Sequence, residues 1–192
     1  MRLIASCLSL ACLAVLSGAA LAADVEVGGK APDFKATGTD GKAYSLAKMG
    51  DAKAVVVCFT CNHCPVAVAY EDRFINFTKK YAKQGVKFVA INVNPEDLEA
   101  MKTRVEEKGF NFPYLKDASG DSAKAFGAQV TPHMFLLDKN RKLAYAGAFD
   151  DSMDATQVSA NYLIDAVDAV LAGKTPKTTK TRPVGCRIRI SP

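Results

Sequence analysis

Two short, mainly apolar runs stand out in the chain, "AKAVVVCF" at 52–59 and "VKFVAINV" at 86–93. Mainly apolar runs of this length, rich in β-branched residues, are typical of strands buried on both faces of a sheet. Upstream, "DFKATGTDGKAYSL" alternates polar and apolar residues around Asp40-Gly41, which predicts a β-hairpin. Residues 133–138 and 142–149 predict two more strands, joined by the turn "DKNR".

Helical periodicity fills the intervals between these runs. From Asn62 to about Lys83, apolar residues recur at three- and four-residue steps, which predicts a long helix. A short helix is expected at 122–126. The last helix is expected at about 155–172, with Gly173 ending it.

Residues 94–109, "NPEDLEAMKTRVEEKG", predict a further helix with Asn94 as N-cap, Pro95 in the first position and Gly109 at the end. The resulting order is a β-hairpin, then β-α-β-α, then β-β-α. It predicts an α/β fold with a central mixed sheet flanked by helices. We assign one domain to 24–173, followed by a tail at 174–192.

The first stretch of the chain differs from the rest. It has an early positive charge at Arg2, an apolar run, and small residues at 20–22. This layout predicts a secretory signal peptide over 1–22, cleaved after Ala22 or Ala23. An uncleaved membrane anchor is the alternative. Either interpretation puts the folded part outside the cytoplasm, which for a bacterial protein means the periplasm.

The amino-acid composition further limits the class of protein. The chain has 192 residues, of which 49% are hydrophobic, enough for a single well-packed core. The net charge of +5 is concentrated after residue 173, where six basic residues and no acidic ones occur. A solvated terminal extension is the favoured interpretation, and contact with a membrane or an acidic partner is the alternative. No nucleic-acid-binding motif accompanies this charge.

Removal of the signal peptide would leave four cysteines: Cys58, Cys61, Cys64 and Cys186. Cys61 and Cys64 form a C-x-x-C pair directly after a predicted buried strand and at the start of a predicted helix. Free N–H groups and the helix dipole at such a junction favour a thiolate, and a protonated His63 would add to that. The pattern therefore predicts thiol–disulfide exchange, with an exposed Cys61 attacking and a more buried Cys64 resolving.

"VTPHMFLLD" supplies a second element, with Thr131-Pro132 just before an apolar strand. A cis bond there would make a tight turn beside the cysteines, whereas a trans bond would make an ordinary turn. With the cis bond, the Thr131 backbone is free to pair with an extended substrate, as an added strand does.

These residues carry a family resemblance. Strand-"CNHC"-helix followed by "VTPHMFLLD" resembles the thioredoxin fold, and "APDF" with "DGKAYSL" resembles the N-terminal hairpin of its redoxin and peroxiredoxin-like branch. "FPYLKD" and the terminal "GCRI" resemble a group of bacterial thioredoxin-family, redoxin-domain proteins over about residues 28–190. The resemblance implies Cys61 as the attacking thiol, Cys64 as the resolving thiol and Pro132 as a cis-proline. It also implies that His63 stabilises the reduced thiolate, as in disulfide oxidases and isomerases.

Departures from the family pattern keep other interpretations open. Thr60 stands where thioredoxins carry tryptophan, and the preceding strand lacks their buried acid. Peroxiredoxins place a proline and a threonine where this chain has Val55 and Cys58, which argues against the alternative of an antioxidant, peroxiredoxin-like peroxidase at Cys61.

Metal binding is the other alternative, since Cys61, Cys64, His63 and His133 could converge on copper or zinc, as in a metallochaperone. His133 is otherwise a contributor to substrate binding or a simple loop residue. For the preferred interpretation, no metal or organic cofactor is needed. The partners are then protein thiols and disulfides, together with a redox protein that recycles the pair.

Four residues remain to be interpreted. Cys58 is interpreted as a buried strand residue. Cys186 is a third redox thiol, a partner for Cys58 or an intermolecular link. Asp150 and Asp151, at the end of the last strand, are interpreted as a solvated turn.

Overall fold

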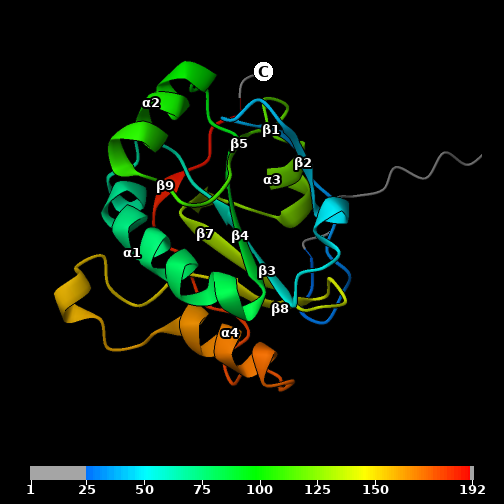
Figure 1. The fold of residues 1–192 in the computed structure, drawn as a ribbon. Coiled ribbons are helices and arrows are strands. Elements are labelled where there is room, and N and C mark those ends of the chain that lie inside the picture. The colour runs from blue at the N-terminus through cyan, green and yellow to red at the C-terminus, as the bar shows by residue number, and fades with distance from the viewer. Residues whose placement is uncertain (1–24, 191–192) are drawn as a thin grey trace, which may run out of the picture.

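The computed structural model describes residues 25–190 and consists of a seven-stranded sheet between helices (Figure 1). The signal peptide predicted at 1–22 lies outside these residues. The strands are β1 (Lys35–Gly38), β2 (Ala43–Ser45), β3 (Ala54–Phe59), β4 (Val86–Asn92), β5 (Tyr114–Lys116), β6 (Val130–Thr131), β7 (His133–Leu137), β8 (Leu143–Gly147) and β9 (Cys186–Arg187). The α-helices are α1 (Pro65–Tyr81), α2 (Leu98–Lys108), α3 (Asp121–Phe126) and α4 (Tyr162–Leu171), with short 3₁₀ turns η1 (Leu46–Met49), η2 (Ala82–Gln84) and η3 (Ala155–Gln157).

The sheet order is β2-β1-β5-β4-β3-β7-β8. Strand β3 lies near the middle, parallel to β4 and antiparallel to β7, and β4 is parallel to β5. The predicted mixed sheet with flanking helices is therefore confirmed, as is the hairpin around Asp40-Gly41. Strand β5 was not predicted, because its three residues are too few to show a period.

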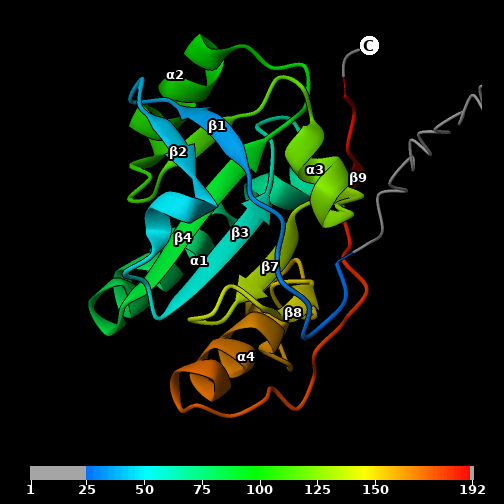
Figure 2. The same ribbon diagram turned by 90° about the vertical axis from the view of Figure 1, so that its right-hand side faces the viewer.

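Strand β3 is buried along its whole length, as its apolar run predicts. Val56 and Cys58 face a layer that contains side chains of α1, α2 and α4. Val57 and Phe59 face the opposite layer, which contains α3. Figures 1 and 2 show these helices on the two faces of the sheet. Burial on both sides holds the carboxyl end of β3 rigidly where the cysteine motif begins.

The predicted starts of the two helices that follow β3 and β4 are wrong. Helix α1 begins at Pro65 with Cys64 as its N-cap, so Asn62 lies in the preceding turn. Helix α2 begins at Leu98, where the N-cap Asp97 accepts a hydrogen bond from the Ala100 N–H at 2.7 Å. Asn94 is therefore not the cap and Pro95 is not the first helical residue, although Gly109 ends this helix as expected with φ +64°.

The predicted last helix at 155–172 is two elements. A single 3₁₀ turn, η3, is followed by extended chain, and the helix α4 begins only at Tyr162. The side chain of Asp154 accepts a hydrogen bond from the Thr156 N–H and stabilises the η3 turn.

The C-terminal residues are not the solvated extension expected from their charge. Figure 2 shows the chain after α4 running back past β8 and α3. Thr181 donates its N–H to the Ala146 carbonyl, and Ile188 and Ile190 pack against the buried layer that contains α3. Strand β9 pairs antiparallel with β6. The described part of this tail is thus packed against the domain.

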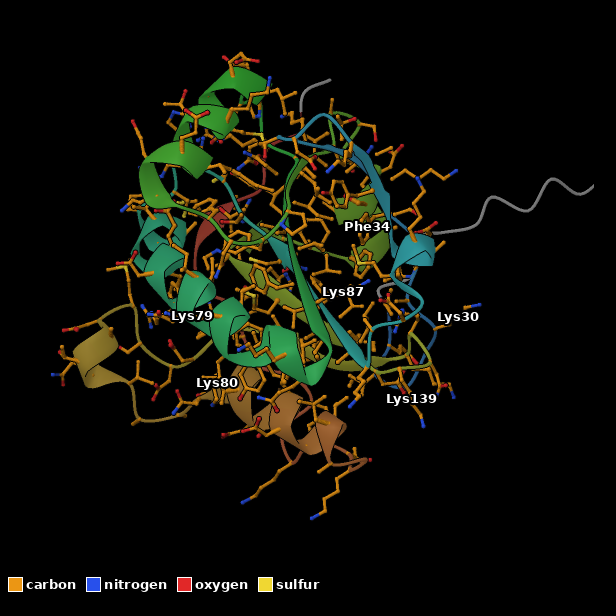
Figure 3. All side chains as sticks on the ribbon, viewed as in Figure 1. Lys30, Phe34, Lys79, Lys80, Lys87 and Lys139 are labelled. Atoms are coloured by element: carbon orange, nitrogen blue, oxygen red, sulfur yellow. The ribbon has the colours of Figure 1, made fainter. Side chains whose placement is uncertain are left out.

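Outside the tail, several of the lysines lie at the surface. In Figure 3 the side chains of Lys30 and Lys139 point away from the ribbon, whereas Phe34 lies inside. Within residues 25–190, no helix has both the length and the apolar character required to cross a bilayer.

Asp150 is not in a solvated turn either. Its side chain is buried, accepts a hydrogen bond from the Tyr70 hydroxyl at 2.7 Å, and forms an ion pair with Arg73 at 2.6 Å. The pair ties the end of β8 to the middle of α1. Asp151 does lie at the surface, where it accepts bonds from the Ser159 and Ala160 N–H groups.

We predict that Asp150→Ala lowers the free energy of unfolding by about 3 kcal/mol, because it leaves a largely buried guanidinium without its counter-ion. Chemical denaturation of the purified protein measures the change. Asp72→Ala, which removes an exposed carboxylate from the same helix, is the matched control and should change stability little. Equal losses in the two variants would contradict the prediction.

Candidate redox site

The two motif cysteines lie at the carboxyl end of the central strand. Cys61 follows β3 after Thr60, and Cys64 caps α1. The Thr131-Pro132 peptide bond is cis, and Thr131 lies beside both sulfur atoms. The Thr131 hydroxyl is 3.2 Å from the Cys61 sulfur, and the Cys64 thiol donates to the Thr131 carbonyl at 3.0 Å. The structure thus brings together the two segments that the sequence singled out.

The expected exposed attacking thiol is not found in this conformation, because Cys61 is only 5% exposed and Cys64 only 2%. Burial raises the pKa of Cys61, and the negative charge of Glu96 adds to this effect. The hydroxyl of Thr131 and the N–H of Cys64 act in the opposite direction without cancelling it.

Cys64 has the more stable thiolate. Burial alone would raise its pKa, but hydrogen bonds from the thiol and N–H of Cys186, together with the Ala67 N–H, hold the pKa below its usual value. The distance from the Cys186 nitrogen to the Cys64 sulfur is 3.4 Å. Donation to Cys64 in turn raises the pKa of Cys186 to about 11. Of the two motif cysteines, Cys64 therefore has its pKa lowered and Cys61 has its pKa raised.

Glu96 is the functional residue that the sequence analysis missed. This buried carboxylate accepts hydrogen bonds from the Asn62 N–H at 2.9 Å and from the Asn92 side chain at 2.6 Å. It also accepts from the His63 N–H at 3.3 Å. Two of the backbone donors that were expected to stabilise a Cys61 thiolate, the N–H groups of Asn62 and His63, are thus bound to Glu96. The carboxyl ends of parallel strands meet at one edge, so an acid just after β4 was the available signal.

His63 does not act on Cys61 as the resemblance implies. Its side chain is 79% exposed, and its Nδ1 lies 2.6 Å from Glu96 Oε1. His133 is buried at the start of β7, where its ring packs against Phe135 with a centroid distance of 4.4 Å. The two histidines therefore do not converge on the cysteines. No group of three or more potential metal-ligating Cys, His, Asp or Glu side chains occurs in the described part of the chain.

The other two cysteines, Cys58 and Cys186, differ in their exposure to solvent. Cys58 is fully buried within β3, and burial raises its pKa strongly. Cys186 is exposed and lies against Cys64, which excludes Cys58 as its partner in this conformation. A cleft of about 340 Å³ opens beside the motif, lined by Cys61, His63, Cys64, Asn94, Pro95, Glu96, Cys186, Arg187 and Arg189.

This fold, with a C-x-x-C pair at a strand-to-helix junction and a cis-proline beside it, defines the class of thioredoxin-fold oxidoreductases. A family model described as Redoxin matches residues 26–164. The chain therefore belongs to the redoxin family.

Curated relatives are named thiol-disulfide oxidoreductases, and solved structures share the fold. The thiol-disulfide oxidoreductase ResA of Bacillus thuringiensis subsp. konkukian is 30% identical over 122 residues, which cover 62% of this chain and 68% of that protein. The crystal structure of a hypothetical protein from Sinorhizobium meliloti 1021 is similar with a TM-score of 0.82 and 40% identity, covering 88% of this chain and 97% of that one. An uncharacterized conserved protein from Geobacillus kaustophilus gives a TM-score of 0.81 and 33% identity, over 87% and 93% of the two chains.

We predict that Glu96→Gln lowers the pKa of Cys61, because it removes a negative charge that disfavours the thiolate. Ultraviolet absorbance of the thiolate, titrated in a Cys64→Ser background, measures the change without requiring access of a reagent. The control is Glu71→Gln, which alters another buried carboxylate that binds Arg104, with a shortest distance of 2.7 Å. An unchanged titration in the Glu96 variant would refute the assigned role.

Proposed function

We propose that this protein is an exported thiol–disulfide oxidoreductase that exchanges disulfides with protein partners through Cys61 and Cys64. The observation that carries the proposal is the contact of both sulfur atoms with one residue, Thr131, which precedes the cis-proline. Two thiols held at one turn are positioned to close a disulfide. Membership of the redoxin family and the name of the ResA relatives support the same chemistry.

The exchange itself needs no cofactor. When Cys61 and Cys64 are joined, a partner thiolate attacks one of the two sulfurs, the S–S bond breaks, and the other sulfur leaves as a thiolate. A second thiol of the partner then displaces the protein, so that the partner loses two electrons and the motif gains them. The reverse sequence reduces a partner disulfide. A separate redox protein restores the starting state of the motif.

We predict that Cys64→Ser reduces the rate of disulfide exchange with a model protein substrate to the uncatalysed background, because it removes half of the Cys61–Cys64 disulfide. Cys58→Ala is the matched control: it deletes a buried thiol that packs as a small apolar residue in β3, and exchange should persist. Retention of activity in the Cys64→Ser variant would show that the pair is not the exchanging centre.

The reduction potential of the Cys61–Cys64 pair decides the direction of transfer. Thiol trapping in glutathione buffers measures this potential, and a value of about −120 to −180 mV would place the protein with those that donate or shuffle disulfides. A value near about −270 mV would instead make the protein a reductant that depends on an electron supply.

Export is proposed from the sequence of residues 1–22 alone. If the signal peptide is cleaved, the mature protein recovered from the periplasm of a bacterial host begins at Ala23 or Asp24. N-terminal sequencing of the fractionated protein measures this. A chain that retains Met1 in the membrane fraction would favour the anchor, and a chain that stays in the cytoplasm would refute export.

A further inference from the structure

Strand β9 occupies the backbone edge that the sequence analysis assigned to a substrate. Cys186 is the pairing partner of Thr131, and Arg187 pairs with Val130. An incoming peptide that adds a strand at Thr131 would need this same position. The protein thus presents one of its own cysteines to the motif in the way that a substrate cysteine would be presented.

The approach of β9 depends on a glycine. A Cβ atom at Gly185 would overlap the carbonyl oxygen of Thr131 and lie 2.6 Å from the carbonyl carbon. No side chain fits at this position unless the strand moves away. Gly185 therefore allows the neighbouring Cys186 to lie against Cys64.

The tail is anchored on both sides of Cys186. Before it, backbone hydrogen bonds join Thr179 and Thr181 to Ala146. After it, the Ile188 N–H donates to the Gln129 carbonyl at 2.9 Å, and the Arg189 N–H donates to the Asn94 side chain at 2.7 Å. Cys186 is consequently held in place, and opening of the tail would break contacts at both ends.

Cys186 differs from the two motif cysteines in its exposure to solvent. Of the four cysteines in the described chain, Cys186 alone is exposed, whereas Cys61 and Cys64 are buried beneath β6 and β9. We propose that Cys186 is a third redox-active thiol, which takes up the disulfide from the motif by bonding to Cys64 and exchanges it with protein thiols outside. This inference rests on the proposed function and identifies Cys186 as the sulfur that reacts with the partner protein.

The steps balance without an added oxidant. Cys186 loses its proton to water and attacks the Cys64 sulfur of the Cys61–Cys64 disulfide. The Cys64–Cys186 bond forms, the Cys61–Cys64 bond breaks, and Cys61 leaves with the electron pair and takes a proton from water. This exchange involves no net oxidation.

A partner thiolate then attacks the Cys186 sulfur, and Cys64 leaves as a thiolate. The N–H groups of Ala67 and Cys186 stabilise the departing Cys64 thiolate. A second partner thiol displaces Cys186, which completes the two-electron oxidation of the partner and returns three thiols to the protein.

The test is disulfide mapping of the Cys61→Ser protein after oxidation with oxidised glutathione. We expect a Cys64–Cys186 disulfide within one chain to be the main product, identified by mass spectrometry of a non-reduced digest. Adding Gly185→Val, which displaces β9 while retaining both cysteines, should strongly reduce that product. Adding Val184→Ala, which trims an exposed neighbouring side chain, should leave it unchanged.

Absence of the Cys64–Cys186 peptide in Cys61→Ser would overturn the inference, as would a linkage found only between two chains. Equal loss with Gly185→Val and Val184→Ala would also overturn it, because placement by the strand would then have no role. Circular dichroism of each variant checks that the fold is retained. The mapping needs no exchange activity, so failure of the proposed function, seen as inactivity of the unmutated protein, is a separate result.

Discussion

Thr131 is the residue on which the arrangement of three sulfur atoms depends. Its hydroxyl contacts Cys61, its carbonyl accepts from Cys64, and its backbone pairs with the strand that carries Cys186. A single residue can make all three contacts because it ends the two-residue strand β6 immediately before the cis-proline and is itself buried. The strand β7 that follows pairs with β3 along five residue positions, which fixes Thr131 relative to the motif. The active edge is therefore positioned by the centre of the sheet.

Charge at this edge is distributed differently from the usual expectation for a C-x-x-C motif. Burial and the negative charge of Glu96 disfavour a Cys61 thiolate, and the N–H groups of Asn62 and His63 are bound to Glu96. Cys61 is left with a raised pKa, while Cys64 receives donors from α1 and β9. Stabilising the Cys64 thiolate favours the reduced protein, and destabilising that of Cys61 acts in the opposite direction. The potential of the pair is consequently set by residues outside the motif.

The sequence predicts most of the sheet because burial on both faces requires uninterrupted apolar residues, as in "AVVVCF" of β3. It predicts helix boundaries less well where two residues could act as the cap. Asn94 and Asp97 are both good N-caps, and the structure uses Asp97 while the Asn94 side chain accepts from the Arg189 N–H. That contact joins residues far apart in the sequence, and no local pattern reports it.

Contacts between residues far apart in the sequence also explain why the sequence locates the candidate site but does not identify all of its residues. "CNHC" and "VTPH" mark it because each combines its chemistry with a local turn or helix start. Glu96 and Cys186 join it only through the parallel pairing of β3 with β4 and the antiparallel pairing of β6 with β9.

A basic C-terminal segment is typical of a solvated tail, but this segment also contains apolar residues that pack against the domain. Ile188 and Ile190 alternate with Arg187 and Arg189, so that the isoleucines pack on the core while both arginines line the cleft beside the motif. This alternation is the period of a strand with one buried face. Gly185 precedes it at the one point where the backbone must approach Thr131 most closely. The end of the tail thus alternates buried and exposed residues as a strand does, and it places the exposed cysteine against the buried pair.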